Sequence, residues 1–434
     1  MRGAATPGVL MVLSVCVCFS QVEAAKPGLP AGDAAVPAAQ AVNPQPVPHY
    51  PVSPHRPQPR HPIGGRWPSF QISACQEITA PGFYLLTADI DTGGAACMNI
   101  HDTHSVSLDC DGHGISGHLF TALDATTPVV VQNASAVIIT NCSLSNRPVT
   151  PTGMFTLWGL DIENSTDIAL TNNNITAIEI NKLSSGHVSN NQIVGYYAQY
   201  NSNNVTISQN SIVGIADEIG AAGIILQGGH SNQALNNTMD GKWDRISEGT
   251  LARGWDDGII LDNEAGDLIS GNSIQNVWGG GIAASDSLQN TVISNNTIQH
   301  AYGCAIGAGW YMDWVGNQVL NNQADDVSQL LTFFYYDDYS PEPPSPTVHF
   351  ENNRFVANVV GKVNGNQSVG SRSEIVISPQ QYIHFLQVQV DHNVLQDNNF
   401  GQYAPFLIPP IGFIDGGGNA CQMPTDGSPI TCHP

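Results

Sequence analysis

The feature that most constrains the fold of this chain is a short motif that recurs 11 times. An asparagine, or in the first two copies a histidine or a cysteine, stands two positions before an apolar residue. The copies are His113-Gly-Ile115, Cys142-Ser-Leu144, Asn173-Asn-Ile175, Asn191-Gln-Ile193, Asn210-Ser-Ile212, Asn237-Thr-Met239, Asn272-Ser-Ile274, Asn296-Thr-Ile298, Asn317-Gln-Val319, Asn353-Arg-Phe355 and Asn393-Val-Leu395. Successive apolar positions are 18 to 40 residues apart. A unit of 18 residues cannot bury a hydrophobic face alone, so neighbouring units must stack.

The residues inside each unit predict short strands. Runs such as Val205-Thr206-Ile207 are β-branched and alternate in polarity. In a stack, each strand pairs with the equivalent strand of the next unit at about 4.8 Å. Asparagine tolerates a left-handed backbone, and its amide can bond to the asparagine of the next unit, so the motif marks a corner between strands. Leucine-rich repeats are the main alternative, but their leucine pattern is missing. The sequence therefore predicts an all-β fold, a single right-handed parallel β-helix of about 11 coils.

Two segments resemble a known group of proteins. Cys75–Leu86 and Ser107–Gly117 are similar to the opening coils of the large right-handed parallel β-helix group, and the resemblance spans roughly Cys75 to Leu395. That group includes pectate-lyase-like enzymes, alginate epimerases and carbohydrate-binding surface proteins. The resemblance implies the fold and an extracellular polysaccharide as partner, but not the reaction, because this fold hosts several.

Composition divides the chain into four parts. Residues 1–25 hold Arg2, an apolar run and small residues before Ala25, which predicts a cleaved signal peptide and a secreted protein, extracellular or periplasmic. The apolar run is too short to span a membrane. Residues 26–68 contain 12 of the 28 prolines and predict a flexible linker. The β-helix is expected over 69–399, and a cap closed by a disulfide over 400–434.

The cysteines are expected to form disulfides, because the compartment is oxidising. The expected pairs are Cys75 with Cys97, Cys110 with Cys142, and Cys421 with Cys432. Cys304 is then left over as a buried thiol.

The formal charge of −23, with only 13 lysines and arginines, argues against nucleic acid or an anionic membrane as partner. An acidic polysaccharide would need a local basic patch or a bridging divalent cation. The sequence does not indicate the oligomeric state.

Alignment of the coils predicts which side chains point outward. An inward column is expected at Leu160, Ile178, Ala198, Ile224, Ile259, Ile282 and Ile306. The outward columns are then expected to hold Asp161, Glu179 and Gln199, and beside them Glu163, Asn181, Asn201, Gln227 and Asp262. Asp161, Glu163 and Glu179 would be neighbours on two coils. Carboxylates this close repel one another unless a cation or a proton neutralises them, so they are a candidate Ca²⁺ site. The alternative is a solvated acidic surface.

The insertion Asp240–Gly258 is the second candidate site. It contains three of the eight lysines and arginines that follow Pro68: Lys242, Arg245 and Arg253. Trp243 and Trp255 are expected to offer flat surfaces for sugar rings. A third cluster, with Trp310 and Tyr311, is expected to form a wall of the same sugar-binding cleft. The structural alternatives are a loop held by ion pairs and a packed core.

Two reactions fit these residues. A lyase or C5-epimerase acting on a uronate needs a cation for the sugar carboxylate and a base for the C5 proton. Its candidates are Lys242, Arg245, Arg253 and His230. An inverting hydrolase needs two carboxyl groups about 6.5–9.5 Å apart. Its candidates are Asp256, Asp257 and Asp262. The remaining alternative is a non-catalytic surface or matrix module.

Overall fold

A computed structural model describes residues 68–92, 96–119, 127–148, 158–215, 219–242, 254–301, 303–327, 331–335, 348–360, 373–379, 388–391, 393–396, 398, 404–406 and 413–415. The predicted signal peptide, the linker up to Trp67 and the Cys421–Cys432 pair lie outside these residues. None of the described segments forms a helix long and apolar enough to cross a bilayer.

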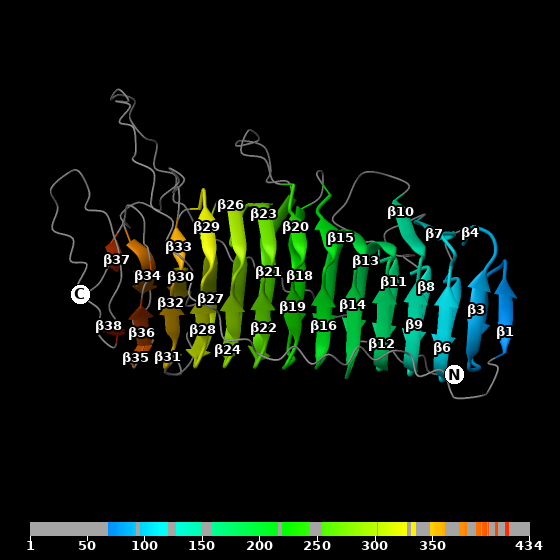
Figure 1. Cartoon of the computed structure of the whole chain (residues 1–434), viewed down its shortest axis with the longest axis horizontal. Coiled ribbons are helices and arrows are strands. Elements are labelled where there is room, and N and C mark those ends of the chain that lie inside the picture. The colour runs from blue at the N-terminus through cyan, green and yellow to red at the C-terminus, as the bar shows by residue number, and fades with distance from the viewer. Residues whose placement is uncertain are drawn as a thin grey trace, which may run out of the picture. The chain divides into compact units, whose positions relative to one another are not determined.

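The described strands form a parallel sheet of 14 strands, named here sheet A, and a parallel sheet of 24 strands. Each coil passes through sheet A and then through two successive parts of the larger sheet, named here sheets B and C (Figure 1). Sheet A contains β1 (Ser69–Ile72), β3 (Gly82–Leu86), β6 (His104–Asp109), β9 (Ser135–Thr140), β12 (Thr166–Thr171), β14 (Gly186–Ser189), β16 (Val205–Ser208), β19 (Gln233–Leu235), β22 (Leu268–Ser270), β25 (Val292–Ser294), β28 (Gln318–Leu320), β32 (Arg354–Val356), β36 (Asn393–Gln396) and β38 (Phe413–Asp415). Sheet B contains β4 (Ile90–Asp91), β7 (Gly114–Leu119), β10 (Ser143–Pro148), β17 (Ser211–Val213), β20 (Thr238–Asp240), β23 (Ser273–Val277), β26 (Thr297–Ala301), β29 (Gln323–Asp325) and β33 (Val359–Val360). Sheet C contains β2 (Gln76–Ile78), β5 (Met98–His101), β8 (Val129–Gln132), β11 (Leu160–Glu163), β18 (Ile219–Gln227), β21 (Gly254–Ala265), β24 (Ile282–Gln289), β27 (Ile306–Val315), β30 (Leu331–Tyr335), β31 (Val348–Glu351), β34 (Ser373–Pro379), β35 (Val388–Asp391) and β37 (Ala404–Phe406). The long strands β13 (Asn174–Asn181) and β15 (Gln192–Tyr200) pass from sheet B into sheet C.

The pairing confirms the predicted stack. Ile175, Ile193, Ile212 and Met239 pair in register from coil to coil, and all are fully buried. Sheet A has 14 described strands. This exceeds the eleven marked units by three, because β1 and β3 precede the first motif copy and β38 follows the last. Pairing also continues past residue 399, since β38 pairs with β36.

The corner between sheets A and B is built by a ladder of buried asparagines. The amide of Asn191, for example, donates from Nδ2 to Asn210 Oδ1 at 3.0 Å and to the Leu170 carbonyl at 3.0 Å. The ladder runs through Asn173, Asn191, Asn210, Asn237, Asn272, Asn296, Asn322, Asn358 and Asn398. The residue before most of these has a positive φ, as in Asn190 at 56°.

The last three motif copies lie at a different corner from the one predicted. Asn317 and Asn353 precede strands of sheet A, and Asn317 N donates to Asn353 Oδ1 at 2.9 Å. They therefore stand at the corner between sheets C and A, as does Asn393, which directly precedes Val394, the partner of Arg354. The two corners present the same local pattern, so the motif alone does not separate them.

The corners differ in the number of residues that join one strand to the next. Two residues join β9 to β10, β12 to β13 and β22 to β23, and the same holds along the A–B corner from β9 up to β33. The two earlier joins are longer, with three residues from β3 to β4 and four from β6 to β7. At the B–C corner, by contrast, β10 ends at Pro148 and β11 begins at Leu160, and β20 ends at Asp240 and β21 begins at Gly254. The variable lengths of the units therefore arise mostly at the B–C corner.

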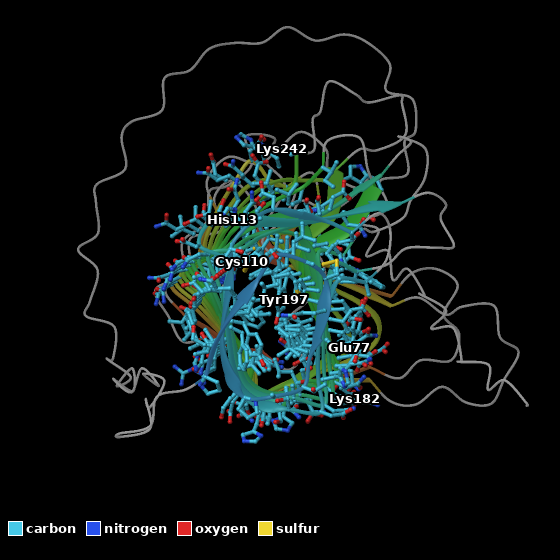
Figure 2. The ribbon with its side chains drawn as sticks, turned by 90° about the vertical axis from the view of Figure 1, so that its right-hand side faces the viewer. Glu77, Cys110, His113, Lys182, Tyr197 and Lys242 are labelled. Carbon is cyan, nitrogen blue, oxygen red and sulfur yellow. A yellow bond between two sulfur atoms is a disulfide. The ribbon has the colours of Figure 1, made fainter. Side chains whose placement is uncertain are left out.

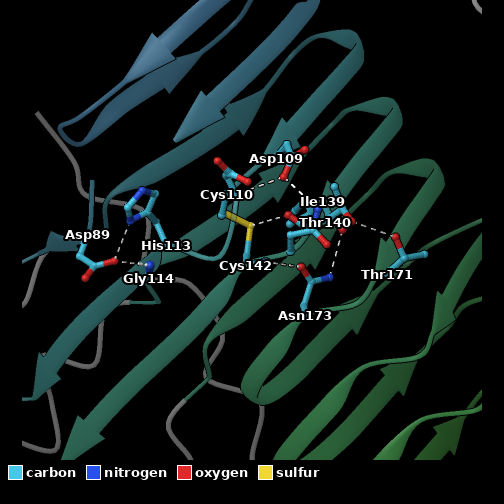
Figure 3. The surroundings of a disulfide bond; sticks show 12 residues. Asp89, Asp109, Cys110, His113, Gly114, Ile139, Thr140, Cys142, Thr171 and Asn173 are labelled. Atoms are coloured by element: carbon cyan, nitrogen blue, oxygen red, sulfur yellow. Dashed lines mark hydrogen bonds and ion pairs between the residues drawn. A yellow bond between two sulfur atoms is a disulfide. The ribbon is translucent and has the colours of Figure 1, made fainter. Parts of the chain in front are cut away.

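Among the described cysteines two disulfides are present, Cys75–Cys97 and Cys110–Cys142, and both match predicted pairs. Cys304 is fully buried and is in neither of them. Cys142 occupies the position that the ladder gives to asparagine, and its N–H donates to Asn173 Oδ1 at 2.9 Å (Figure 3). The disulfide thus links Cys142, at the start of the ladder, covalently to Cys110 of the preceding coil.

A β-bulge in β15 shifts the predicted register by one residue. Thr176 pairs with Val194, but Ile178 pairs with Tyr197, so β15 contains one extra residue, next to Gly195. Gly195 has a φ of 113°, which glycine adopts without steric cost. The inward column therefore holds Tyr197 in place of Ala198, and Tyr197 lies inside the coil (Figure 2).

Candidate functional site

The outer side of sheet C brings together the three carboxyl groups expected to be neighbours. Asp161 pairs with Glu179 and Glu163 with Asn181, on the adjacent strands β11 and β13. Their neighbours Ile162 and Ile180 are fully buried, so the alternation of the strands turns the polar side chains outward. We call Asp161, Glu163 and Glu179 the carboxyl row.

The carboxyl row is half-buried, and this changes its protonation. Burial, and then the charge of Glu163, raise the pKa of Asp161 to about 6. Burial, and then Asp161 and Glu163, raise the pKa of Glu179 to about 7. Glu163 Oε2 accepts a hydrogen bond from Gln132 Nε2 at 2.8 Å. The described side chains include no set of three carboxyl, imidazole or thiol groups arranged to hold a metal ion. The raised pKa values mean that Asp161 and Glu179 hold a proton more readily than free carboxyl groups, which lessens the repulsion within the row.

An aromatic group lies beside the carboxyl row. Trp158 Nε1 donates to Tyr196 Oη at 2.7 Å, across the small Ala177 of the intervening coil. Tyr200 pairs with Asn181, and burial and then Glu179 raise its pKa to about 12. Trp158 and Tyr200 remain partly exposed and pack against an outer apolar cluster. The cluster consists of Ala177, Tyr196, Ala198, Ala222, Ile225, Ile260 and Ala283.

The predicted outward columns need correction after the bulge. Ala198 and Tyr200 face outward, where Gln199 and Asn201 were expected. Gln199 points into the core, is 1% exposed, and accepts a hydrogen bond from Tyr197 Oη at 2.7 Å. Tyr196 and Tyr200 are therefore residues of the site that sequence reasoning missed. The sequence contained a signal for the extra residue in β15. The spacing between successive ladder asparagines grows from 18 residues, Asn173 to Asn191, to 19 residues, Asn191 to Asn210.

The insertion contributes less than expected. Trp255 is 2% exposed and packs in the core beside Gly214 and Gly223, so the prediction that it stacks on a sugar was wrong. Lys242 Nζ pairs with Asp240 Oδ2 at 2.6 Å. Trp243, Arg245 and Arg253 lie outside the described residues.

The three aspartates of the insertion and the following strand do not form one cluster. Asp256 and Asp257 are consecutive in β21, so their side chains leave opposite faces of the strand. Asp257 is fully buried, and its Oδ1 accepts a hydrogen bond from Gly280 N at 2.5 Å. Asp262 follows five residues later, on the order of 15 Å along the strand. This exceeds the separation that an inverting pair requires.

Burial raises the pKa values of two of these aspartates. The pKa of Asp256 is raised to about 6 by burial alone. Burial and then Asp286 raise the pKa of Asp262 to about 6, against the opposing effect of its hydrogen bonds. One of these comes from Gln227 Nε2 to Asp262 Oδ2 at 2.6 Å. His230 is exposed and pairs with Ala265 at the far end of β21, so it does not join Asp256 or Asp257.

Gly309 pairs with Ser285, which pairs with Asp262, so Trp310 directly follows this outward column as the sequence predicted. The side chains of Trp310 and Tyr311 lie outside what the structure describes.

Comparison with known proteins adds a family model described as a right-handed β-helix region, which matches residues 200–329. Among solved structures, the chain is similar to the A-module of mannuronan C-5 epimerase AlgE6 from Azotobacter vinelandii, at 12% identity, a TM-score of 0.41, and coverage of 82% of this chain and 91% of that one. It is also similar to the Dettilon tailspike protein, at 13% identity, a TM-score of 0.47, and coverage of 78% of this chain and 60% of that one. A third similar structure is DFA-IIIase from Arthrobacter chlorophenolicus A6, at 10% identity, a TM-score of 0.44, and coverage of 75% of this chain and 83% of that one. No curated protein sequence matches. The coil architecture and the matched model together identify the chain as a right-handed parallel β-helix protein.

Proposed function

We propose that this protein is secreted and that the outer side of sheet C binds a polysaccharide beside the carboxyl row. The single observation behind the proposal is that the row lies beside the aromatic group: Tyr200 pairs with Asn181, two residues after Glu179, and the charge of Glu179 raises the pKa of Tyr200. Aromatic faces pack against the C–H faces of sugar rings, while carboxyl and amide oxygens accept from sugar hydroxyls. Two disulfides support an oxidising compartment.

The charge of the site favours a neutral sugar over a uronate. A ligand carboxylate beside Asp161, Glu163 and Glu179 would be repelled, and the one described basic residue of the insertion, Lys242, is paired with Asp240. Glu179, with a pKa near neutrality, is suited to give a proton to a glycosidic oxygen, and Asp161 to act as the carboxylate partner. We therefore favour hydrolysis over the lyase or epimerase reaction as the accompanying chemistry.

The test is a panel of neutral glycans, pectate and alginate, with and without Ca²⁺, assayed for binding by calorimetry and for turnover by reducing ends and by absorbance of unsaturated products. We expect binding of a neutral glycan that Trp158→Ala weakens about tenfold or more, since loss of one stacking residue removes a central contact. Phe70→Ala is the matched control, because Phe70 is an exposed ring on sheet A.

The outcomes separate the alternatives. Binding that Trp158→Ala and Phe70→Ala affect equally would place the site elsewhere. Binding without turnover would make the protein a non-catalytic surface module. A calcium-dependent unsaturated product from pectate or alginate would restore the lyase, and calcium-dependent C5 inversion detected by NMR would restore the epimerase.

A further inference from the structure

A pair of acidic side chains is buried at the corner between sheets C and A, away from the carboxyl row. Glu264, near the end of β21, and Asp267, directly before β22, are each 2% exposed. Glu264 is in register with Leu288 of the next coil, which pairs with Trp314 of the coil after that. A carboxyl group thus occupies a position that the following coils give to large apolar side chains.

A second ladder passes through Asp267. The backbone N–H of each coil donates to a side-chain oxygen of the next coil: Asn232 N to Asp267 Oδ1 at 2.7 Å, Asp267 N to Thr291 Oγ1 at 3.3 Å, Thr291 N to Asn317 Oδ1 at 2.8 Å, and Asn317 N to Asn353 Oδ1 at 2.9 Å. The asparagines of this ladder also donate from Nδ2 to a carbonyl of the preceding coil: Asn232 to Ser202, Asn317 to Leu288, and Asn353 to Trp314. Asp267 has an oxygen where these residues have a donor.

The surroundings of the pair supply donors to only three of its four oxygens. Glu264 Oε1 accepts from Gly229 N at 2.8 Å, and Glu264 Oε2 accepts from Asn232 Nδ2 at 3.1 Å. Asp267 Oδ1 accepts from Asn232 N. No N–H or O–H group of the described residues donates to Asp267 Oδ2. A proton between the two carboxyl groups satisfies that oxygen.

The charged groups nearby do not provide a counter-ion. Neither carboxyl forms an ion pair with a described lysine, arginine or histidine. The preceding coil presents His230, which is exposed and hydrogen-bonded to Ser231 and through its backbone to Asn203. Asp262 lies two residues before Glu264 on β21, and Asp286 of the next coil raises its pKa, so the charged groups on this side of the pair are acidic too. Two ionised carboxylates at this corner would repel each other without compensation.

We propose that Glu264 and Asp267 share one proton in the folded chain, and that this proton acts as a latch which holds the corner between β21 and β22 closed. When the proton leaves, the buried charges repel and the corner opens. Consistent with this, burial and then Asp267 raise the pKa of Glu264 to about 9, while the pKa of Asp267 rises to about 6. The pair therefore keeps a single proton at neutral pH.

The direction of the pH effect follows from proton binding. Because the pKa of Glu264 is higher in the folded chain than its usual value of 4.5, the folded chain binds more protons than the unfolded chain between these limits. The contribution of the pair to stability is therefore greatest in acid and falls as the pH rises, by about tenfold in the unfolding equilibrium per pH unit for one such group.

The test is denaturant unfolding from about pH 6 to about pH 9, followed by circular dichroism, with amide exchange at Gly229 and Asn232 as a local measurement. Glu264→Gln keeps an N–H donor in place of the proton, and we expect it to remove the alkaline loss of stability and the alkaline rise in exchange at both amides. Glu77→Gln is the control, because Glu77 is an exposed carboxyl of sheet C, 74% exposed.

Asp267→Asn is the second variant, and it restores the residue type that the ladder uses elsewhere. We expect it to fold and to flatten the same pH profile. Profiles for both variants that run parallel to the wild-type profile would overturn the latch, as would amide exchange at Gly229 that does not depend on pH beyond the intrinsic rate. Should Glu264→Gln fail to fold, Asp267→Asn decides by the same criterion.

Discussion

Replacement of Asn173 by alanine tests the asparagine ladder directly. The side chain of Asn173 makes three hydrogen bonds: Oδ1 accepts from Cys142 N at 2.9 Å, and Nδ2 donates to the Ile139 carbonyl at 3.0 Å and to Asn191 Oδ1 at 3.0 Å (Figure 3). Asn191 Oδ1 keeps the N–H of residue 173 as a donor. Asn173→Ala therefore leaves the buried N–H of Cys142 without its side-chain acceptor and removes one hydrogen bond to the Ile139 carbonyl.

A buried N–H without an acceptor costs about 1–3 kcal/mol and the loss of one further hydrogen bond about 1 kcal/mol, so the free energy of unfolding should fall by about 2–4 kcal/mol. Asn174→Ala is the matched control, since Asn174 is exposed and its φ is not positive, and it should change stability by less than about 0.5 kcal/mol. The assay is urea unfolding followed by circular dichroism, with amide exchange at Cys142. If the two variants unfold at the same urea concentration, the ladder does not stabilise the fold as reasoned here.

Three further predictions concern the site and its surroundings. Gly195→Val should lower the free energy of unfolding by about 1–3 kcal/mol in urea titrations, because valine is strained at a φ of 113°, and it should weaken glycan binding in calorimetry by displacing Tyr196. The double variant Cys110→Ser, Cys142→Ser should lose about 3–4 kcal/mol of unfolding free energy, measured without reductant, because the bond closes a sequence separation of 32 residues. Turnover of the neutral glycan should decline as the pH rises above about 7, because Glu179 then loses the proton that it donates; a rate that stays constant to about pH 9 would remove Glu179 from that role.

The stack could be predicted from the sequence because an asparagine recurs at the same corner of most coils. Each buried rung needs an amide that both donates and accepts, as Asn210 does, and few residues replace it. The same local requirement exists at the C–A corner, which is why Asn317 and Asn353 entered the same series. Which corner an asparagine occupies depends on what pairs across coils, and this is not a local property.

The site was predicted only where the register was regular. Asp161 and Glu179 came out as neighbours because β11 and β13 pair without interruption. One extra residue beside Gly195 then moved Gln199 inward and Tyr200 outward, since a shift of one residue in a strand exchanges its faces. Trp255 looked like a ligand-binding residue in the sequence, but whether an indole lies in the core or on the surface depends on the glycines packed against it, Gly214 and Gly223.

The A–B and B–C corners differ in the number of residues that join their strands, and they therefore serve different purposes within each coil. From β9 onward, where the asparagine ladder runs, the A–B corner has two residues wherever it is described, whereas the B–C corner accommodates joins of very different length. New segments can therefore be gained there during divergence, or grafted there by design, without loss of the ladder. Since that corner borders sheet C, such changes would alter what the surface recognises while the scaffold stays constant.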